Sequence, residues 1–347
     1  MPQKKSHRTT LLIAIGIIAL LAAGGIFAWQ NPFWGKRLPQ PPESQPGALT
    51  DPTLATTSQP TAPTSLPSAA AQPEEDPQEE ASPSAKPLCN GPAAMDILAL
   101  VIDKQAQADS IRLIHLDFIT PAVSVVAIPR DFYVPIVDMA DHGITRGRIN
   151  ATYGYGEYYL GQGEGVFSLA DNLYHNFGVS FDEYVVLKLS SVAELIDNID
   201  GIEIHLEQPV ADDHRYFAKG DHQLDGESAV DFMSIRYYDD DFHRIDRQTM
   251  VLQALLQKAR GDLNLIQQTK LALSALGDDS VQTSLPVKAL PPLICLGRTL
   301  DQSDVDFVQI PPDLYHPWTT PSGGAVQIPQ VGVAAFLQDF QEHGLAD

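Results

Sequence analysis

An uncharged apolar run near the start of the chain constrains the fold more than any other feature of the sequence. The 19 residues 11–29, LLIAIGIIALLAAGGIFAW, contain no charged side chain. An α-helix needs about twenty apolar residues to cross the hydrocarbon core of a bilayer. The run therefore predicts a transmembrane helix.

A cleaved secretory signal peptide is the alternative for this run. Its apolar region usually spans only about 7–15 residues and ends in a small-x-small cleavage site. Here the run ends in Phe27, Ala28 and Trp29, and Phe33 and Trp34 follow shortly after it. Aromatic residues at such a position are typical of a membrane interface, so a retained anchor is favoured.

The basic residues around the run predict its orientation. Three precede it and two follow it: Lys4, Lys5, Arg8, Lys36 and Arg37. Because basic flanks stay in the cytoplasm and short tails stay behind more easily than folded domains, we expect a cytoplasmic tail over residues 1–10. The chain is then a single-pass protein of the cytoplasmic membrane, with its bulk extracytoplasmic.

Residues 38–87 form a second, unlike segment. Twelve of these 50 residues are proline, mixed with Ser, Thr, Gln and Ala. Such a composition offers too few large apolar residues to build a core. We expect a disordered stalk between the membrane and a globular domain that begins near residue 88.

The rest of the chain alternates short apolar runs with helical patterns. The apolar and β-branched runs predict strands over residues 96–102, 111–119, 123–128, 184–189, 202–206 and 305–310. Helical periodicity predicts helices over residues 168–177, 191–198, 226–237, 246–259, 265–276 and 331–343. This alternation is typical of a layered α/β domain with a mixed sheet.

Charge excludes one class of partner. The chain has 44 Asp and Glu against 22 Lys and Arg, a formal net charge of −22. An acidic chain repels phosphate backbones, so no nucleic-acid partner is expected. From residue 88 onward the formal charge is −21, with only ten arginines, and the positions of those arginines are therefore informative.

Six of the ten arginines lie in three short segments: Arg130, Arg146, Arg148, Arg236, Arg244 and Arg247. Arg130 closes a predicted strand, and Arg244 and Arg247 lead into a predicted helix. Guanidinium groups and a helix N-terminus both bind phosphate well. The alternative is ordinary ion pairing with neighbouring aspartates at 239–241 and 246, which the residues alone favour.

Two carboxylates offer a complementary half of such a site. Asp103 closes the first predicted strand and Asp109 precedes the second, so both could project from one edge of the sheet. Together with arginines they could hold a diphosphate through Mg²⁺. The alternative is that both are turn-forming residues, which is the commoner role of loop aspartates.

An ordered series of motifs resembles the LytR-CpsA-Psr (LCP) family over about residues 95–259. The motifs are Asp109-Ser-Ile-Arg-Leu, Ala127-Ile-Pro-Arg-Asp131, Arg148-Ile-Asn-Ala-Thr-Tyr153, Phe181-Asp-Glu-Tyr184, Asp200-Gly-Ile-Glu-Ile204, Leu224-Asp-Gly-Glu-Ser-Ala229 and Asp241-Phe-His-Arg-Ile-Asp-Arg-Gln248. The order makes the series specific, although each motif alone is weak.

The resemblance implies a three-layer α/β/α catalytic domain over residues 88–262, with a C-terminal extension over residues 263–347 packed on it. It implies a phosphotransferase that moves a glycopolymer from a polyprenyl diphosphate carrier to peptidoglycan or another envelope acceptor. The lipid tail of the carrier is then expected in an apolar tunnel between sheet and helices, and membrane lipid is an expected partner.

The resemblance also implies roles for individual residues. The diphosphate is expected to bind to Arg130, Arg148, Arg236, Arg244, Arg247 and Gln248. Asp103 and Asp109 are expected to hold Mg²⁺, whereas Asp131 or Asp241 orders the arginines or serves as base beside Arg130 and Arg244. Such chemistry needs little beyond placement and neutralisation of the phosphoryl oxygens.

Two positions depart from the family pattern. The usual Gly-x-Asp-Ser-Arg after the first strand is Val101-Ile-Asp-Lys-Gln105, and an arginine often found two places before Arg236 is Ser234. Two alternative functions therefore stay open. One is hydrolysis of the carrier diphosphate, and the other is a non-enzymatic binding or regulatory role in the envelope.

The chain has only two cysteines, Cys89 and Cys295. Two cysteines cannot form a zinc site of the CxxC type. Outside the cytoplasm a disulfide persists, so we hypothesise a bridge that ties the start of the domain to its C-terminal extension.

Overall fold

A computed structural model describes residues 86–235, 241–260 and 281–344. The expected tail and membrane helix, the expected stalk as far as residue 85, the expected helix over 265–276 and Arg236 lie outside these ranges. Among the residues described, no helix has both the length and the apolar character that crossing a bilayer requires.

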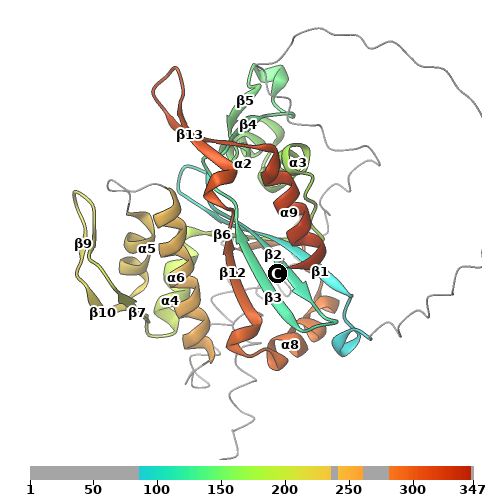
Figure 1. The fold of residues 1–347 in the computed structure, drawn as a ribbon, viewed down its shortest axis with the longest axis vertical. Helices are drawn as coiled ribbons and strands as arrows, with labels where there is room; N and C mark the ends of the chain where they lie inside the picture. Colours follow the sequence, from blue (N-terminus) through green and yellow to red (C-terminus); the bar gives the residue numbers. More distant parts are fainter. Residues whose placement is uncertain (1–85, 236–240, 261–280, 345–347) are drawn as a thin grey trace, which may run out of the picture.

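The domain is built on a six-stranded sheet with the order β11-β6-β1-β2-β3-β12 (Figure 1). Its strands are β1 (Ala94–Ile102), β2 (Ala108–Asp117), β3 (Ala122–Ala127), β6 (Glu183–Lys188), β11 (Val281–Thr283) and β12 (Val305–Gln309). The pairs β1–β6 and β3–β12 are parallel, and the other neighbours are antiparallel. The predicted mixed α/β sheet is thus confirmed.

Both faces of the sheet are buried, since alternate side chains of β1 enter different apolar clusters. Leu98 and Leu100 pack with residues of α3 (Gly165–Phe177) and α9 (Val331–His343). Ile97 points to the opposite face and packs in a cluster with α8 (Leu290–Thr299). Burial on two sides explains why residues 111–119 alternate only partly in the sequence.

Three further helices lie on the α8 side of the sheet: α4 (Leu189–Asn198), α5 (Gly226–Ser234) and α6 (Asp241–Arg260). Figure 1 shows them grouped together, away from α3 and α9. Their own core includes the strand β7 (Ile202–Leu206), paired with β10 (Gly220–Leu224). Sheet and helices therefore form three layers.

The C-terminal part of the chain is integral to this sheet. Its strands β11 and β12 form the two edges, and α9 buries Val333, Leu337 and Phe340 against the central core. The boundary expected at 262/263 is therefore wrong as a structural boundary, because the described residues beyond it complete the sheet instead of packing on a finished domain.

The remaining elements are short. They are η1 (Leu88–Asn90), β4 (Tyr133–Pro135), η2 (Ala140–His142), β5 (Arg146–Arg148), α2 (Ala151–Tyr155), the π-helical turn η3 (Gly156–Leu160), β8 (Val210–Ala211), β9 (Tyr216–Phe217), η4 (Val287–Ala289), η5 (Gln302–Asp304), η6 (Pro312–Leu314), β13 (Tyr315–Thr319) and β14 (Ala325–Pro329). A disulfide joins Cys89 in η1 to Cys295 in α8, with Cα atoms 6.2 Å apart.

Candidate functional site

Asp109 lies at the centre of a buried group of charged side chains. Its Oδ2 lies 2.6 Å from Nη2 of Arg244, and its Oδ1 accepts a hydrogen bond from Nη1 of Arg130. Its main-chain carbonyl accepts hydrogen bonds from Nη2 of Arg244 at 2.9 Å and from Nε2 of Gln248 at 3.3 Å. The side chains of Asp109, Arg130 and Arg244 are less than a tenth exposed.

Strand register and helix periodicity bring these residues together. The antiparallel register pairs Arg112 of β2 with Ala127 of β3, and its continuation beyond β3 puts Arg130 opposite Asp109. Arg244 and Gln248 are four residues apart on α6 and so share one helix face. This helix begins at Asp241, five residues before the expected start at 246, so Arg244 lies within it as well as Arg247.

Asp131 links two of the predicted diphosphate-binding arginines. Its Oδ1 lies 3.1 Å from Nε of Arg148, and its Oδ2 lies 3.6 Å from Nε of Arg130. Arg148 also donates from Nη2 to the carbonyl oxygen of Ala325 at 2.8 Å. This geometry suits the ordering role that was expected of Asp131.

Other predicted site residues lie further out. Arg247 is buried and donates from Nη2 to the carbonyl oxygen of Ile235 at 2.7 Å, so it ties α6 to the end of α5. Asp241 begins α6, but its side chain is outside the described part of the structure, as is Arg236.

Asp103 lies in the turn between β1 and β2. Its Oδ1 accepts hydrogen bonds from the main-chain N–H groups of Gln105 and Gln107, both at 2.9 Å. This is the turn-forming role that loop aspartates commonly have. Asp103 and Asp109 nevertheless flank the same end of the β1–β2 hairpin.

The fit of these carboxylates to Mg²⁺ depends on the substrate. In the described ranges, no group of three or more His, Cys, Asp or Glu gathers as a cation site. Mg²⁺, however, is usually held by only one or two protein carboxylates together with substrate phosphate oxygens. The carboxylate oxygens of Asp103 and Asp109 are ligands of the type that Mg²⁺ prefers.

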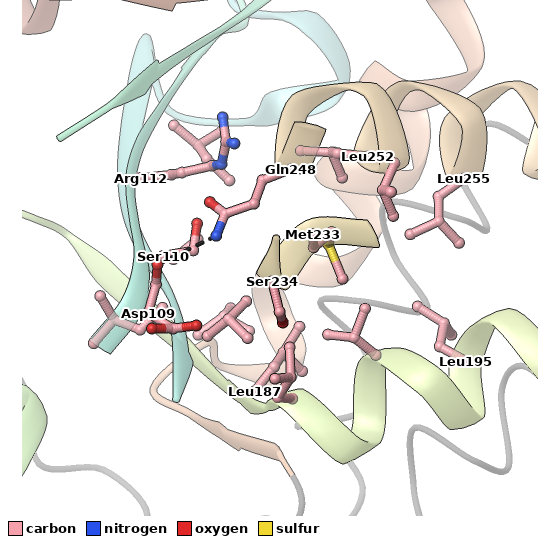
Figure 2. Close-up of a pocket in the computed structure, with 18 residues that line it drawn as sticks. Asp109, Ser110, Arg112, Leu187, Leu195, Met233, Ser234, Gln248, Leu252 and Leu255 are labelled. Carbon is pink, nitrogen blue, oxygen red and sulfur yellow. Dashed lines mark hydrogen bonds between the residues drawn. The ribbon is translucent and has the colours of Figure 1, made fainter. Parts of the chain in front are cut away.

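An apolar cavity of about 160 Å³ adjoins the charged group. It lies between the sheet, represented by Ala99, Val101, Val185 and Leu187, and the helices α4, α5 and α6, represented by Val192, Leu195, Met233, Val251, Leu252 and Leu255. Figure 2 shows Leu195 and Leu255 at one end, and Asp109, Arg112 and Gln248 at the other. The cavity thus has an apolar body and a polar end.

The polar end of the cavity is continuous with the arginine group. Asp109, Ser110 and Gln248 line both the apolar cavity and a smaller hollow, whose walls include Arg130 and Arg244. A ligand with a long apolar tail and an anionic head could therefore place its tail among the leucines and its head among the guanidinium groups.

Arg112 is a cavity residue that sequence reasoning did not select. It lies within the motif Asp109-Ser-Ile-Arg-Leu, yet in the sequence it looks like a solvent-facing position of a strand. The structure buries it to 6% exposure in the cavity wall. A sequence feature that points to Arg112 is an arginine in the middle of a strand whose neighbouring residues predict burial on both faces.

The comparison with known proteins identifies the family. The model of the LytR_cpsA_psr family matches residues 65–327, more than half of the chain. The chain therefore belongs to this family, which confirms the resemblance stated above.

Two curated relatives carry different functional names. Polyisoprenyl-teichoic acid–peptidoglycan teichoic acid transferase TagU of Bacillus cereus is 28% identical over 170 residues, which cover 47% of this chain and 52% of TagU. Regulatory protein MsrR of Staphylococcus aureus is 27% identical over 209 residues, which cover 57% of this chain and 59% of MsrR. The chain thus matches between half and three fifths of the length of these relatives.

Solved structures share the fold. The crystal structure of Bacillus subtilis TagV has a TM-score of 0.57 at 23% identity, covering 72% of this chain and 97% of TagV. The structure of TagT bound to LI-WTA has a TM-score of 0.55 at 20% identity, covering 73% of this chain and 91% of TagT. The three-layer domain is therefore the fold of these proteins.

Proposed function

We propose that this chain transfers a glycopolymer from a polyprenyl diphosphate carrier to a cell-wall acceptor such as peptidoglycan. The single observation that carries the proposal is the continuity between the apolar cavity and the buried Asp109–Arg130–Arg244 group. Membership of the family and the transferase name of TagU support it. We further propose that residues 11–29 anchor the chain in the cytoplasmic membrane, with the domain outside.

In the proposed reaction an acceptor hydroxyl oxygen forms a bond to the glycan-side phosphorus. The bond between that phosphorus and the bridging oxygen breaks, and the bridging oxygen leaves with the electron pair on the polyprenyl phosphate. The hydroxyl proton passes to a carboxylate base, for which Asp131 and Asp241 are the candidates. The protein contributes mainly position and charge to such a step.

The arginines carry the electrostatic part of the mechanism. Asp109 holds Arg130 and Arg244 in place through its two ion pairs. Asp131 orders Arg130 and Arg148. Guanidinium forks bind phosphoryl oxygens bidentately, so the diphosphate takes over part of the contact that Asp109 makes. Asp103 and Asp109 would hold Mg²⁺, which would supply further neutralisation of the diphosphate charge.

The test uses the purified full-length chain in detergent micelles, with Mg²⁺, a polyprenyl diphosphate glycan and peptidoglycan oligomers. Glycan covalently attached to the oligomers supports the proposal. Released phosphate or free glycan without transfer supports diphosphate hydrolysis instead. Absence of any turnover supports the regulatory role that the name of MsrR carries.

A variant tests the assignment of the site. The double substitution Arg130→Ala with Arg244→Ala is expected to lower the transfer rate at least about 100-fold, since removing one preorganised charge-stabilising donor costs about 10²–10³ in other enzymes. Lys219→Met, which removes an exposed positive charge between β9 and β10, serves as the control. A double variant that folds and retains full activity contradicts the assignment.

A further inference from the structure

The position of Arg112 in the sheet directs its side chain into the apolar cavity. Ser110, Arg112 and Ile114 alternate along β2 and all line that cavity. The residues paired with Arg112 on the two neighbouring strands are Ala99 and Ala127. Because alanine side chains are small, the guanidinium group has room among its cross-strand neighbours.

The surroundings of Arg112 differ from those of the other buried arginines. Its Nη2 donates a hydrogen bond to Oγ1 of Thr249 at 3.1 Å, and this partner is neutral. Within the described ranges, no carboxylate forms an ion pair with Arg112, whereas Arg130 and Arg244 both contact Asp109. Burial lowers the pKa of Arg112 to about 10, so the side chain still carries its charge at neutral pH.

A buried cation without a counter-ion is costly, and proteins rarely keep one. The polar groups that share the cavity wall with Arg112 are Asp109, Ser110, Ser234 and Gln248. The carboxylate of Asp109 forms its ion pairs with Arg130 and Arg244, and none with Arg112. The three neutral side chains, Ser110, Ser234 and Gln248, can donate hydrogen bonds to an anion but cannot neutralise the arginine. We therefore infer that the negative charge that neutralises Arg112 belongs to a ligand.

We propose that Arg112 binds the phosphate that remains attached to the polyprenyl chain, so that the cavity is a site for a polyprenyl monophosphate. This inference rests on the proposed function for the identity of the lipid. The order of residues along the cavity gives its direction. Arg112 lines the apolar cavity, Asp109 and Gln248 line its junction with the smaller hollow, and Arg130 and Arg244 line that hollow alone.

This order assigns the two phosphates of the carrier to different arginines. The lipid-side phosphate meets Arg112, and the glycan-side phosphate meets Arg130 and Arg244. In the transfer step, the bridging oxygen leaves with its electron pair on the lipid-side phosphate. Arg112 then stabilises the leaving group and afterwards holds the lipid product.

Equilibrium binding to the full-length chain in detergent micelles tests the proposal, with geranylgeranyl monophosphate and geranylgeraniol as probes in titration calorimetry. The wild-type chain is expected to prefer the phosphate at least about tenfold, which corresponds to about 1.4 kcal/mol. Arg112→Met is expected to abolish this preference while the alcohol binds as before. Arg112→Lys is expected to retain part of it, because the charge remains without the fork.

Two control variants separate binding from a structural role. Thr249→Val removes the hydrogen bond between α6 and Arg112 but leaves the charge, and is expected to keep the preference for the phosphate. Lys219→Met removes an exposed charge and is also expected to keep it. If Thr249→Val reproduces the loss seen with Arg112→Met, Arg112 acts by tying β2 to α6 and the proposal fails.

Thermal unfolding gives a readout that does not depend on the ligand. Since Arg112→Met replaces an uncompensated buried charge by an apolar side chain, the ligand-free variant is expected to have a higher Tm than the wild-type chain. A lower Tm identifies a structural arginine and overturns the proposal.

The binding test also distinguishes this inference from the proposed function. If the wild-type chain transfers glycan and Arg112→Met keeps the preference for the phosphate, the proposed role of Arg112 is contradicted. The proposed transferase function is unaffected by that result. Arg112-dependent phosphate preference without any transfer supports the lipid-phosphate site and contradicts the transferase.

Discussion

Asp109 and Arg244, 135 residues apart in the sequence, form a buried ion pair with Oδ2 and Nη2 2.6 Å from each other. The pair connects the start of β2 to the first turn of α6 at the polar end of the cavity. Buried ion pairs of this kind often add no more stability than apolar residues of similar size, because both charges lose their hydration. Since stability alone does not explain this ion pair, its position beside an apolar cavity agrees with a role in ligand binding.

Removal of the carboxylate alone is expected to be costly. Asp109→Ala leaves the buried guanidinium groups of Arg130 and Arg244 without this partner, and we expect a loss of about 3–5 kcal/mol in the free energy of unfolding, measured in urea. The control Asp221→Asn affects a carboxylate that is 92% exposed beside His205, and should cost less than about 1 kcal/mol. Equal effects of the two variants would contradict the assigned burial.

Filling the cavity is expected to impair lipid binding without disturbing the charged group. Leu252 of α6 lines the apolar part of the cavity. Leu252→Trp should weaken binding of geranylgeranyl monophosphate at least about tenfold, whereas the volume-conserving Leu252→Met should bind it like the wild-type chain. Calorimetric titration of both variants checks this, and unchanged affinity in the tryptophan variant would mean that the lipid binds elsewhere.

Periodicity and apolar runs predicted the central strands and α9 well. The expected strand over 202–206 and the expected helix over 331–343 have the bounds of β7 and α9. The sequence did not predict β11, because its three residues are too few for a pattern. Nor did it predict α8, because Pro291 and Pro292 read as helix breakers although proline is tolerated in a first helical turn.

The candidate site was predictable in its residue types and not in its contacts. Arg130 stood out because arginines are scarce in an acidic domain, Asp109 because it precedes a predicted strand, and all three of Asp109, Arg130 and Gln248 because the family motifs contain them. Their mutual contacts depend on the register of β2 with β3 and on the docking of α6, which only the tertiary structure gives. Arg112 escaped notice for the same reason.

The disulfide between Cys89 and Cys295 is expected to stabilise the domain. It closes a loop with a sequence separation of 206 residues, and long loops gain most from such a constraint. Reduction should lower the free energy of unfolding by about 2–5 kcal/mol. Alkylation of the unreduced full-length chain followed by mass analysis checks the bridge, and two alkylated thiols would show that it does not form.

The Asp212–Arg215 pair is expected to make stability depend on acid pH. Hydrogen bonds from Arg215 lower the pKa of Asp212 from 3.8 to about 2, and Arg215 also donates to the carbonyl oxygen of Ser234 at 3.2 Å. Because the pKa is lower in the folded state, the stabilisation is complete above about pH 4 and is lost as the pH falls towards 2. Asp212→Asn should flatten this part of the curve of unfolding free energy against pH, and a curve parallel to that of the wild-type chain would contradict the pairing.

The C-terminal helix α9 is expected to be a structural part of the domain. Leu337 is fully buried in the central core, whereas Val331 at the start of the same helix is 67% exposed. Leu337→Ala should therefore cost about 2–5 kcal/mol in the free energy of unfolding, and Val331→Ala less than about 0.5 kcal/mol. If α9 were only a separate extension packed on a finished domain, Leu337→Ala would release the helix and leave the main unfolding transition unchanged. A single cooperative transition shifted to lower urea, followed by circular dichroism, is the result that the two edge strands β11 and β12 predict.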